Sequence, residues 1–139
     1  MTGSACFEYS ITDDEWSNLP NLNVDRFTHA SCSFSNRYVF VYGGIDSSKY
    51  TPLNSIEKLD MSNSKMFELK WELIEFRGEQ LDALQNAKML QLNPYEICIF
   101  GKGSAAYYDV RDNTTTRSKH RPHQKYEGYC MPAILTANG

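Results

Sequence analysis

The hydrophobic pattern of the sequence is clearest in a segment that starts near residue 29. Small and apolar residues alternate over residues 29–34, which indicates a strand with one buried face. A polar break at residues 35–37 precedes Tyr38–Tyr42, a run of β-branched and aromatic residues that is apolar on both faces. The pattern predicts a β-hairpin whose second strand lies between neighbouring sheets. Gly43 and Gly44 then end this strand, as expected where close packing or a positive φ requires glycine.

Two more strand-like segments follow the hairpin. Beyond a polar loop at residues 45–53, residues 55–61 alternate between apolar and polar side chains. After a turn-rich stretch, residues 67–76 predict another strand with Trp71 near its centre. Together with the hairpin, these segments make four antiparallel strands in about fifty residues, which is the size of one propeller blade.

The same pattern recurs along the chain. Residues 92–101 repeat residues 34–43 at a shift of 58 positions: strand end, polar turn, buried strand and glycine. Upstream, residues 6–16 match the second half of the same unit, with a strand, a short acidic turn and Trp16. Three partial copies at a near-constant period indicate a repeat architecture.

A helix is the main structural alternative for residues 79–92. Good helix formers fill this segment, and Leu81 and Leu84 would lie on one stripe. A short helix would fit within the connecting loop predicted at residues 77–85. A helix that continued through Leu92 would break the third copy.

The repeated unit resembles the kelch repeat. In that family a blade carries Arg or His near its first strand, a diglycine after the second, then a Tyr and a Trp. Leu59 stands here where the family usually has Tyr, and Gly-Lys-Gly at 101–103 replaces the diglycine of the third copy. The repeat register predicts that Trp16 and Trp71 pack between blades. The matching positions are Trp16, Arg26, His29, Gly43, Gly44, Trp71, Gly101 and Tyr108.

The predicted fold is all-β, a partial kelch-type propeller built of four-stranded antiparallel blades. Its expected parts are half a blade (1–18), a complete blade (19–76), a degenerate blade (77–118) and a basic loop with a C-terminal strand or tail (119–139). A closed ring needs roughly four to eight blades, and two and a half leave sheet flanks open. We therefore expect a fragment of a longer protein, a chain that closes its ring by assembly, or a piece docked onto a partner.

The charge distribution separates the two ends of the chain. The net charge of −3 argues against a dedicated nucleic-acid binder. Residues 1–25 carry five acidic side chains and no Lys or Arg, whereas residues 111–125 carry five Lys or Arg against one acid. This polarity predicts either a partner surface or two solvated loops, and the role of the basic segment stays open.

The cysteines and the N-terminus indicate a protein of the cytoplasm or of an organelle lumen, and the cytoplasm is the expected location. The four cysteines show no CxxC spacing, so reduced thiols are expected. The N-terminus has neither the basic start nor the apolar core of a signal peptide, and no stretch is long and apolar enough to span a bilayer. One metal-like set, His120, His123 and Cys130, lies around Pro122 in a loop-like segment, and no metal site is predicted there.

Enzyme chemistry is not predicted. The sequence holds no GxSxG motif, and residues 101–104 (GKGS) lack the spacing of a phosphate loop. Some kelch-like propellers are enzymes, but their catalytic residues have no counterparts here. No catalytic residue and no cofactor is therefore expected.

The sequence predicts a protein-interaction module. Antiparallel geometry should place the loops 19–28, 45–53 and 77–85 on one face, which would bind a macromolecular partner. The alternatives are a structural subunit embedded in a large assembly, a homo-oligomer, and a fragment of a propeller enzyme. The predicted contact residues are Arg26, Lys49, Tyr50, Arg77 and Gln80.

Overall fold

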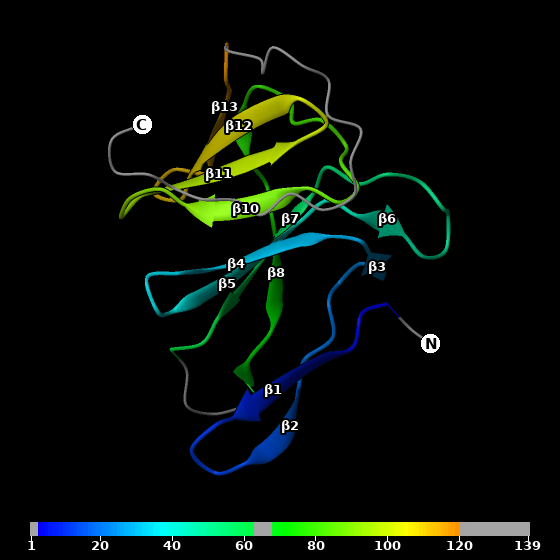
Figure 1. Cartoon of the computed structure of the whole chain (residues 1–139), viewed down its shortest axis with the longest axis vertical. Coiled ribbons are helices and arrows are strands. Elements are labelled where there is room, and N and C mark those ends of the chain that lie inside the picture. The colour runs from blue at the N-terminus through cyan, green and yellow to red at the C-terminus, as the bar shows by residue number, and fades with distance from the viewer. Residues whose placement is uncertain (1–2, 63–67, 120–139) are drawn as a thin grey trace.

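The structure, a computed structural model, describes residues 3–62 and 68–119. This part of the chain is all-β, which confirms the predicted fold class, a partial propeller of antiparallel blades (Figure 1). Its strands are β1 (Cys6–Ser10), β2 (Glu15–Leu19), β3 (Arg26–Phe27), β4 (Ala30–Phe34), β5 (Tyr38–Tyr42), β6 (Ile45–Asp46), β7 (Ile56–Asp60), β8 (Trp71–Ile74), β9 (Arg77–Gly78), β10 (Lys88–Gln91), β11 (Glu96–Gly101), β12 (Ser104–Asp109) and β13 (Thr114–Arg117).

The strands form three sheets and a short ribbon. The first sheet is the hairpin β1–β2, and the middle sheet has the order β4-β5-β7-β8. The third sheet has the order β10-β11-β12-β13-β9, in which β9 pairs with β13 in parallel. Strands β3 and β6 form the ribbon. In Figure 1 the middle sheet lies between the first sheet, at the lower end, and the third sheet, at the upper end.

The predicted hairpin at the start of the middle sheet is confirmed. Strands β4 and β5 pair in the register that sets Phe34 opposite Tyr38. Ser35 and Asn36 adopt left-handed conformations with φ of 53° and 51°, as the two central residues of a type I′ turn do. The Arg37 amide closes the turn by donating to the Phe34 carbonyl at 3.1 Å.

The helix considered for residues 79–92 is not formed, and that alternative is wrong. Leu81 and Leu84 lie in an irregular connection, where both side chains are buried in the core. Strand β10 follows and pairs with β11 along its length. Tertiary packing of the two leucines and the pairing of β10 therefore override the local helix propensity.

The main core lies between the middle and third sheets. Its aromatic centre is an edge-to-face contact of Phe40 with Tyr108, whose ring centroids are 5.8 Å apart. Aliphatic side chains from both sheets fill the space around this contact, and they include Ile56, Ile74, Ile97 and Ile99. Burial of this apolar surface is the main force that holds the two sheets together.

A second cluster joins the first sheet to the middle one. Leu59 and Trp71 of the middle sheet pack there with Leu22, and Cys6 and Leu19 contribute from the hairpin. Trp71 is 7% exposed and its indole N–H donates to the Pro20 carbonyl at 2.9 Å. Trp71 thus occupies a packing position between sheets, as the repeat register predicted.

Trp16 does not pack between blades, and that expectation is wrong. Its side chain is 71% exposed, although it stands opposite Tyr9 in the hairpin as Trp71 stands opposite Leu59. Trp16 is exposed because none of the described sheets covers the face of the hairpin that carries it.

Gly43 and Gly44 hold the conformations for which glycine was predicted. Their φ values are 67° and 87°, and the Gly44 amide donates to the Leu84 carbonyl at 2.8 Å. A Cβ atom at position 43 would lie 2.5 Å from the same carbonyl oxygen. A side chain at position 43 would therefore separate β5 from the connection that precedes β10.

We expect Gly43→Ala to destabilise the protein by more than about 1 kcal/mol, because the new Cβ meets backbone at a positive φ. Urea denaturation would measure the change. Gly101→Ala is the control, since a Cβ there meets its nearest atom at 3.3 Å without a positive φ. Equal losses in both variants would contradict the role given to Gly43.

Candidate partner-binding surface

Three connecting segments meet at one end of the middle sheet, where β5 ends and β7 begins. The Ser47 amide donates to the Asp25 carbonyl at 2.9 Å, which joins the first two segments. The Leu84 amide donates to the Leu53 carbonyl at 3.2 Å, which joins the second segment to the third. The loops predicted to share a face, 19–28, 45–53 and 77–85, are thus in contact through their backbones.

Arg26 is buried, and its prediction as a partner contact is wrong. The residue is 1% exposed, and its guanidinium lies 2.7 Å from a Glu57 carboxylate oxygen. The same group donates to the Gly43 carbonyl at 2.9 Å and to the Ser55 hydroxyl at 3.0 Å. Burial lowers the pKa of Arg26, while the adjacent Glu57 opposes that effect. Arg26 ties the ribbon to the ends of β5 and β7.

Glu57 is a structural residue that the sequence reasoning did not identify. Its fully buried carboxylate accepts hydrogen bonds from the backbone amides of Asn23 and Val24, at 2.8 and 3.2 Å, and from the Asn23 side chain. With Arg26 these groups satisfy the buried charge. The available signal was an acidic residue next to Ile56 in a strand predicted to lie inside a blade.

Asp46 sets the shape of the loop that follows the ribbon. One carboxylate oxygen accepts from the Ser48 hydroxyl at 2.6 Å and from the amides of Ser48 and Lys49, at 2.8 and 3.1 Å. The backbone of Asp46 also bonds to Tyr50 and Thr51. The hydrogen bond from the Ser48 hydroxyl, followed by those from the two amides, lowers the pKa of Asp46. The charged carboxylate is therefore the form that holds this turn.

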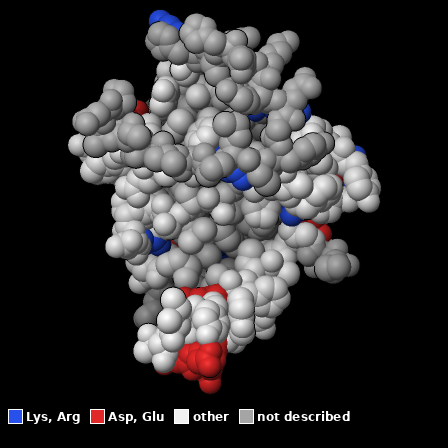
Figure 2. Space-filling model, in the orientation of Figure 1, with Lys and Arg blue, Asp and Glu red and all other residues white. Residues whose placement is uncertain are grey.

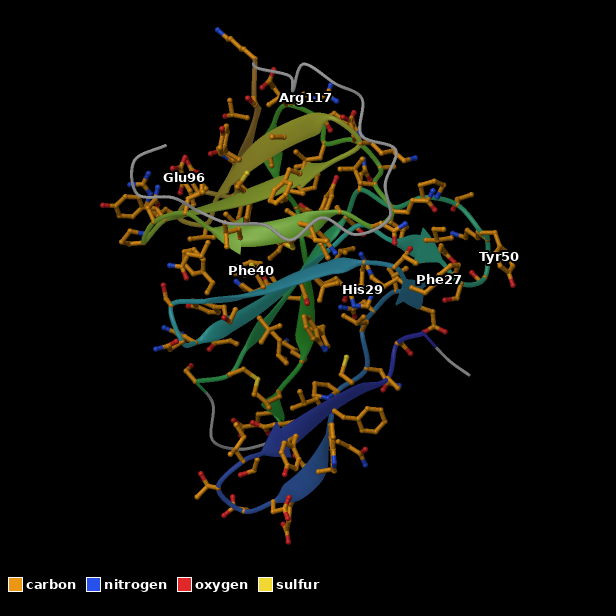
Figure 3. All side chains as sticks on the ribbon, viewed as in Figure 1. Phe27, His29, Phe40, Tyr50, Glu96 and Arg117 are labelled. Carbon is orange, nitrogen blue, oxygen red and sulfur yellow. The ribbon has the colours of Figure 1, made fainter. Side chains whose placement is uncertain are left out.

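The turn presents Tyr50 to solvent. Tyr50 is 77% exposed and has a φ of 53°, an uncommon conformation for a tyrosine. Figure 3 shows Tyr50 on the outer side of this loop, with Phe27 and His29 on the neighbouring segment around β3. Phe27 pairs with Ile45 in the ribbon and is itself exposed. We call the exposed residues Phe27, His29, Lys49 and Tyr50 the tip surface.

Arg77 and Gln80, the other predicted contacts, are exposed, but neither belongs to the tip surface. Arg77 pairs with Thr114 at the start of β13, next to the β12–β13 turn. That end of the third sheet lies opposite the end where Gly101 approaches Leu84 and the loops meet. Gln80 precedes Leu81, whose carbonyl accepts from the Asn54 side chain at 3.3 Å, so it lies at the border of the loop cluster.

The described residues contain few groups suited to metal or thiol chemistry. Within residues 3–62 and 68–119 no group of three or more His, Cys, Asp or Glu side chains is placed to hold a metal ion. His120, His123 and Cys130 lie outside the described residues. Cys6, Cys32 and Cys98 are free thiols, and burial raises the pKa of Cys32 to about 11. Within the described residues, no helix is long and apolar enough to cross a membrane.

Comparison with known proteins bears directly on the middle sheet. No curated protein matches the chain. A family model described as the kelch motif matches residues 26–72, from the buried Arg26 to just beyond Trp71. The matched residues include strands β3 to β7 and the diglycine, and the match ends within β8. The family model therefore covers nearly the same residues as the ribbon and the four-stranded middle sheet. The four-stranded middle sheet therefore matches a kelch motif, and this match supports the resemblance of the chain to the kelch-repeat family.

Proposed function

We propose that the chain is a protein-interaction module that binds a macromolecular partner through the tip surface. The kelch motif supports an interaction role in general terms. The observation that carries the specific proposal is Tyr50, which is 77% exposed on a loop held in one conformation by Asp46. Tyrosine is among the residues that most often supply binding energy at protein interfaces.

The loop is suited to binding because its conformation is already fixed. Ordering a loop on association costs free energy, and that cost is small where hydrogen bonds hold the loop beforehand. Asp46 supplies these bonds, while Phe27 and Tyr50 offer apolar area and a hydroxyl, and Lys49 adds a positive charge. A partner with an apolar contact site and a nearby acidic group would complement this set.

The proposal treats the chain as a binding protein and not as an enzyme, in keeping with the usual role of kelch repeats. It also places the protein in the cytoplasm. The free thiols of Cys6, Cys32 and Cys98 support that location, because reducing compartments keep cysteines in this state. A role as a structural subunit of a large assembly is the second candidate, and the exposed face of the β1–β2 hairpin favours it.

We expect Tyr50→Ala to weaken partner binding about tenfold or more while leaving the melting temperature nearly unchanged. A photoreactive amino acid at position 49 would first capture the partner, and titration calorimetry would then compare the two affinities. The matched control is Tyr95→Ala, an exposed tyrosine on the turn before β11. Unchanged affinity for Tyr50→Ala, or an equal loss for Tyr95→Ala, would remove the tip surface from the binding site.

A further inference from the structure

Each of the three sheets contains the same pair of strands, the third and fourth strands of a blade: β1 with β2, β7 with β8, and β12 with β13. In the first sheet, none of the described sheets covers the outer face of this pair. In each pair of strands, one residue of the third strand lies directly opposite one residue of the fourth. These cross-strand pairs are Tyr9 with Trp16, Leu59 with Trp71, and Tyr108 with Thr115. The third strand also pairs with a second strand in the middle and third sheets, β7 with β5 and β12 with β11. Within the described residues, β1 pairs with β2 alone.

Burial at these positions follows the presence of a covering sheet. Leu59, Trp71, Tyr108 and Thr115 are all buried. Tyr9 is 43% exposed and Trp16 is 71% exposed, and their rings contact each other with centroids 5.0 Å apart. The same face carries Phe7, two positions from Tyr9, and the adjoining turn carries Ile11, and both are exposed. We call Phe7, Tyr9, Ile11 and Trp16 the N-terminal aromatic patch.

The packing inside the chain shows what covers such a face. Tyr108 of the third sheet is covered by the middle sheet through its contact with Phe40. The pair Leu59 and Trp71 of the middle sheet is covered by the first sheet and its linker. Each unit therefore directs this pair toward the sheet that precedes it in the stack. The N-terminal aromatic patch faces the position of such a sheet, and none of the described strands fills it.

The far end of the stack offers a complementary surface. In the third sheet Ile97 and Ile99 face the core, so the residues that alternate with them lie on the opposite face. The centre of that outward face carries half-buried side chains, Leu90, Cys98, Phe100 and Tyr107, with Lys88 near one end and Glu96 and Asp109 at the other. It provides the apolar sheet surface that covers the equivalent pair elsewhere in the chain.

Charges are complementary between the first hairpin and one end of the third sheet, the end that carries Lys88 and lies away from Glu96 and Asp109. The turn of the first hairpin carries Asp13 and Asp14, and Glu15 begins β2; these acidic residues lie at the lower end of the molecule, where Figure 2 shows an acidic area. The third sheet carries Lys88 on its outward face and Lys102 on the turn that follows β11. A head-to-tail contact would bring opposite charges together and would disfavour a contact between like ends.

We propose that the N-terminal aromatic patch binds the outward face of the third sheet of a second copy of this chain. The contact is heterologous, because each copy offers a patch at one end and a receiving face at the other. The stack of sheets then continues from one copy to the next. This surface is separate from the tip surface, and the proposal does not depend on the partner proposed for Tyr50.

Sedimentation velocity of the full chain at increasing concentrations tests this contact. We expect the mean mass to rise with concentration, and Trp16→Ser and Tyr9→Ser each to weaken the association at least about tenfold. Both substitutions replace exposed side chains, and an unchanged melting temperature would show that the fold is intact. Leu73→Ser is the matched control, an exposed large apolar residue outside both proposed surfaces, and it should associate like the unmodified chain.

A charge exchange identifies the two surfaces. Asp14→Lys reverses one charge at the patch end and Lys88→Glu reverses the charge at the basic end of the receiving face, so each variant alone should associate more weakly than the unmodified chain. A mixture of the two variants should form a one-to-one complex, in which the Lys of one meets the Glu of the other. The proposal would be overturned by a mass that stays that of one chain at every concentration. An association that Trp16→Ser leaves unchanged, or a mixture no tighter than its components, would also overturn it.

Discussion

Glu57→Ala is expected to destabilise the protein by about 3–5 kcal/mol, although Glu57 touches no proposed binding surface. The substitution leaves the Arg26 guanidinium buried without its carboxylate, 2.7 Å away in the intact protein. It also removes the acceptor of the Asn23 and Val24 amides, which holds the segment after β2 against β7. The penalty arises mainly from the charge and donors that stay buried and unpaired, and not from the strength of the ion pair itself.

Chemical denaturation of the variant and the unmodified chain would measure this loss. Asp60→Ala is the control, because it breaks the solvent-exposed ion pair with Arg37, which should contribute about 1 kcal/mol or less. The double variant Arg26→Met with Glu57→Leu should recover part of the stability, since it leaves no buried charge. A Glu57→Ala variant no less stable than Asp60→Ala would contradict the structural role of this pair.

Trp71→Ala is expected to cost about 3–5 kcal/mol, as a large aromatic side chain is removed from a closed core. Trp71 packs with Leu59 and Leu22 between the first and middle sheets. It also donates its indole N–H to the Pro20 carbonyl, the hydrogen bond that fixes the linker over this cluster. The variant loses the packing and the hydrogen bond together, so the attachment of the first sheet should weaken most.

Thermal and urea unfolding would give the free energy of unfolding, and amide exchange in β1 and β2 would report the attachment of the hairpin. Leu73→Ala is a matched control on the same strand, since Leu73 is a large apolar residue with half of its surface exposed. We expect a change within about 0.5 kcal/mol for this control. A Trp71→Ala variant as stable as the control would remove Trp71 from the core.

The local parts of the fold could be predicted from the sequence. The hairpin of β4 and β5 followed from alternation and a polar turn, because strand periodicity and turn conformations are set by neighbouring residues. Gly43 and Gly44 were recognised because a positive φ imposes a local requirement that glycine meets. The repeat of this pattern then predicted stacked sheets, since one such unit cannot bury its apolar faces alone.

The candidate site was predicted only in part, because burial depends on residues that are distant in the sequence. Lys49 and Tyr50 were placed on the surface, and the structure exposes both. Arg26 was assigned to the same surface, but its guanidinium is buried and donates a hydrogen bond to the carboxylate of Glu57, 31 positions away in the sequence. Arg77 was expected beside Tyr50, but its pairing with Thr114 holds it at the other end of the third sheet.

Trp16 and Trp71 show where the sequence alone reaches its limit. By itself, the sequence determined that each tryptophan stands at the same point of a repeated strand pair, because that position depends on local spacing. Only the tertiary structure decided that Trp71 is buried and Trp16 exposed. Burial requires a second sheet across the face, and the presence of that sheet is a property of the assembled stack and not of the strand that carries the residue.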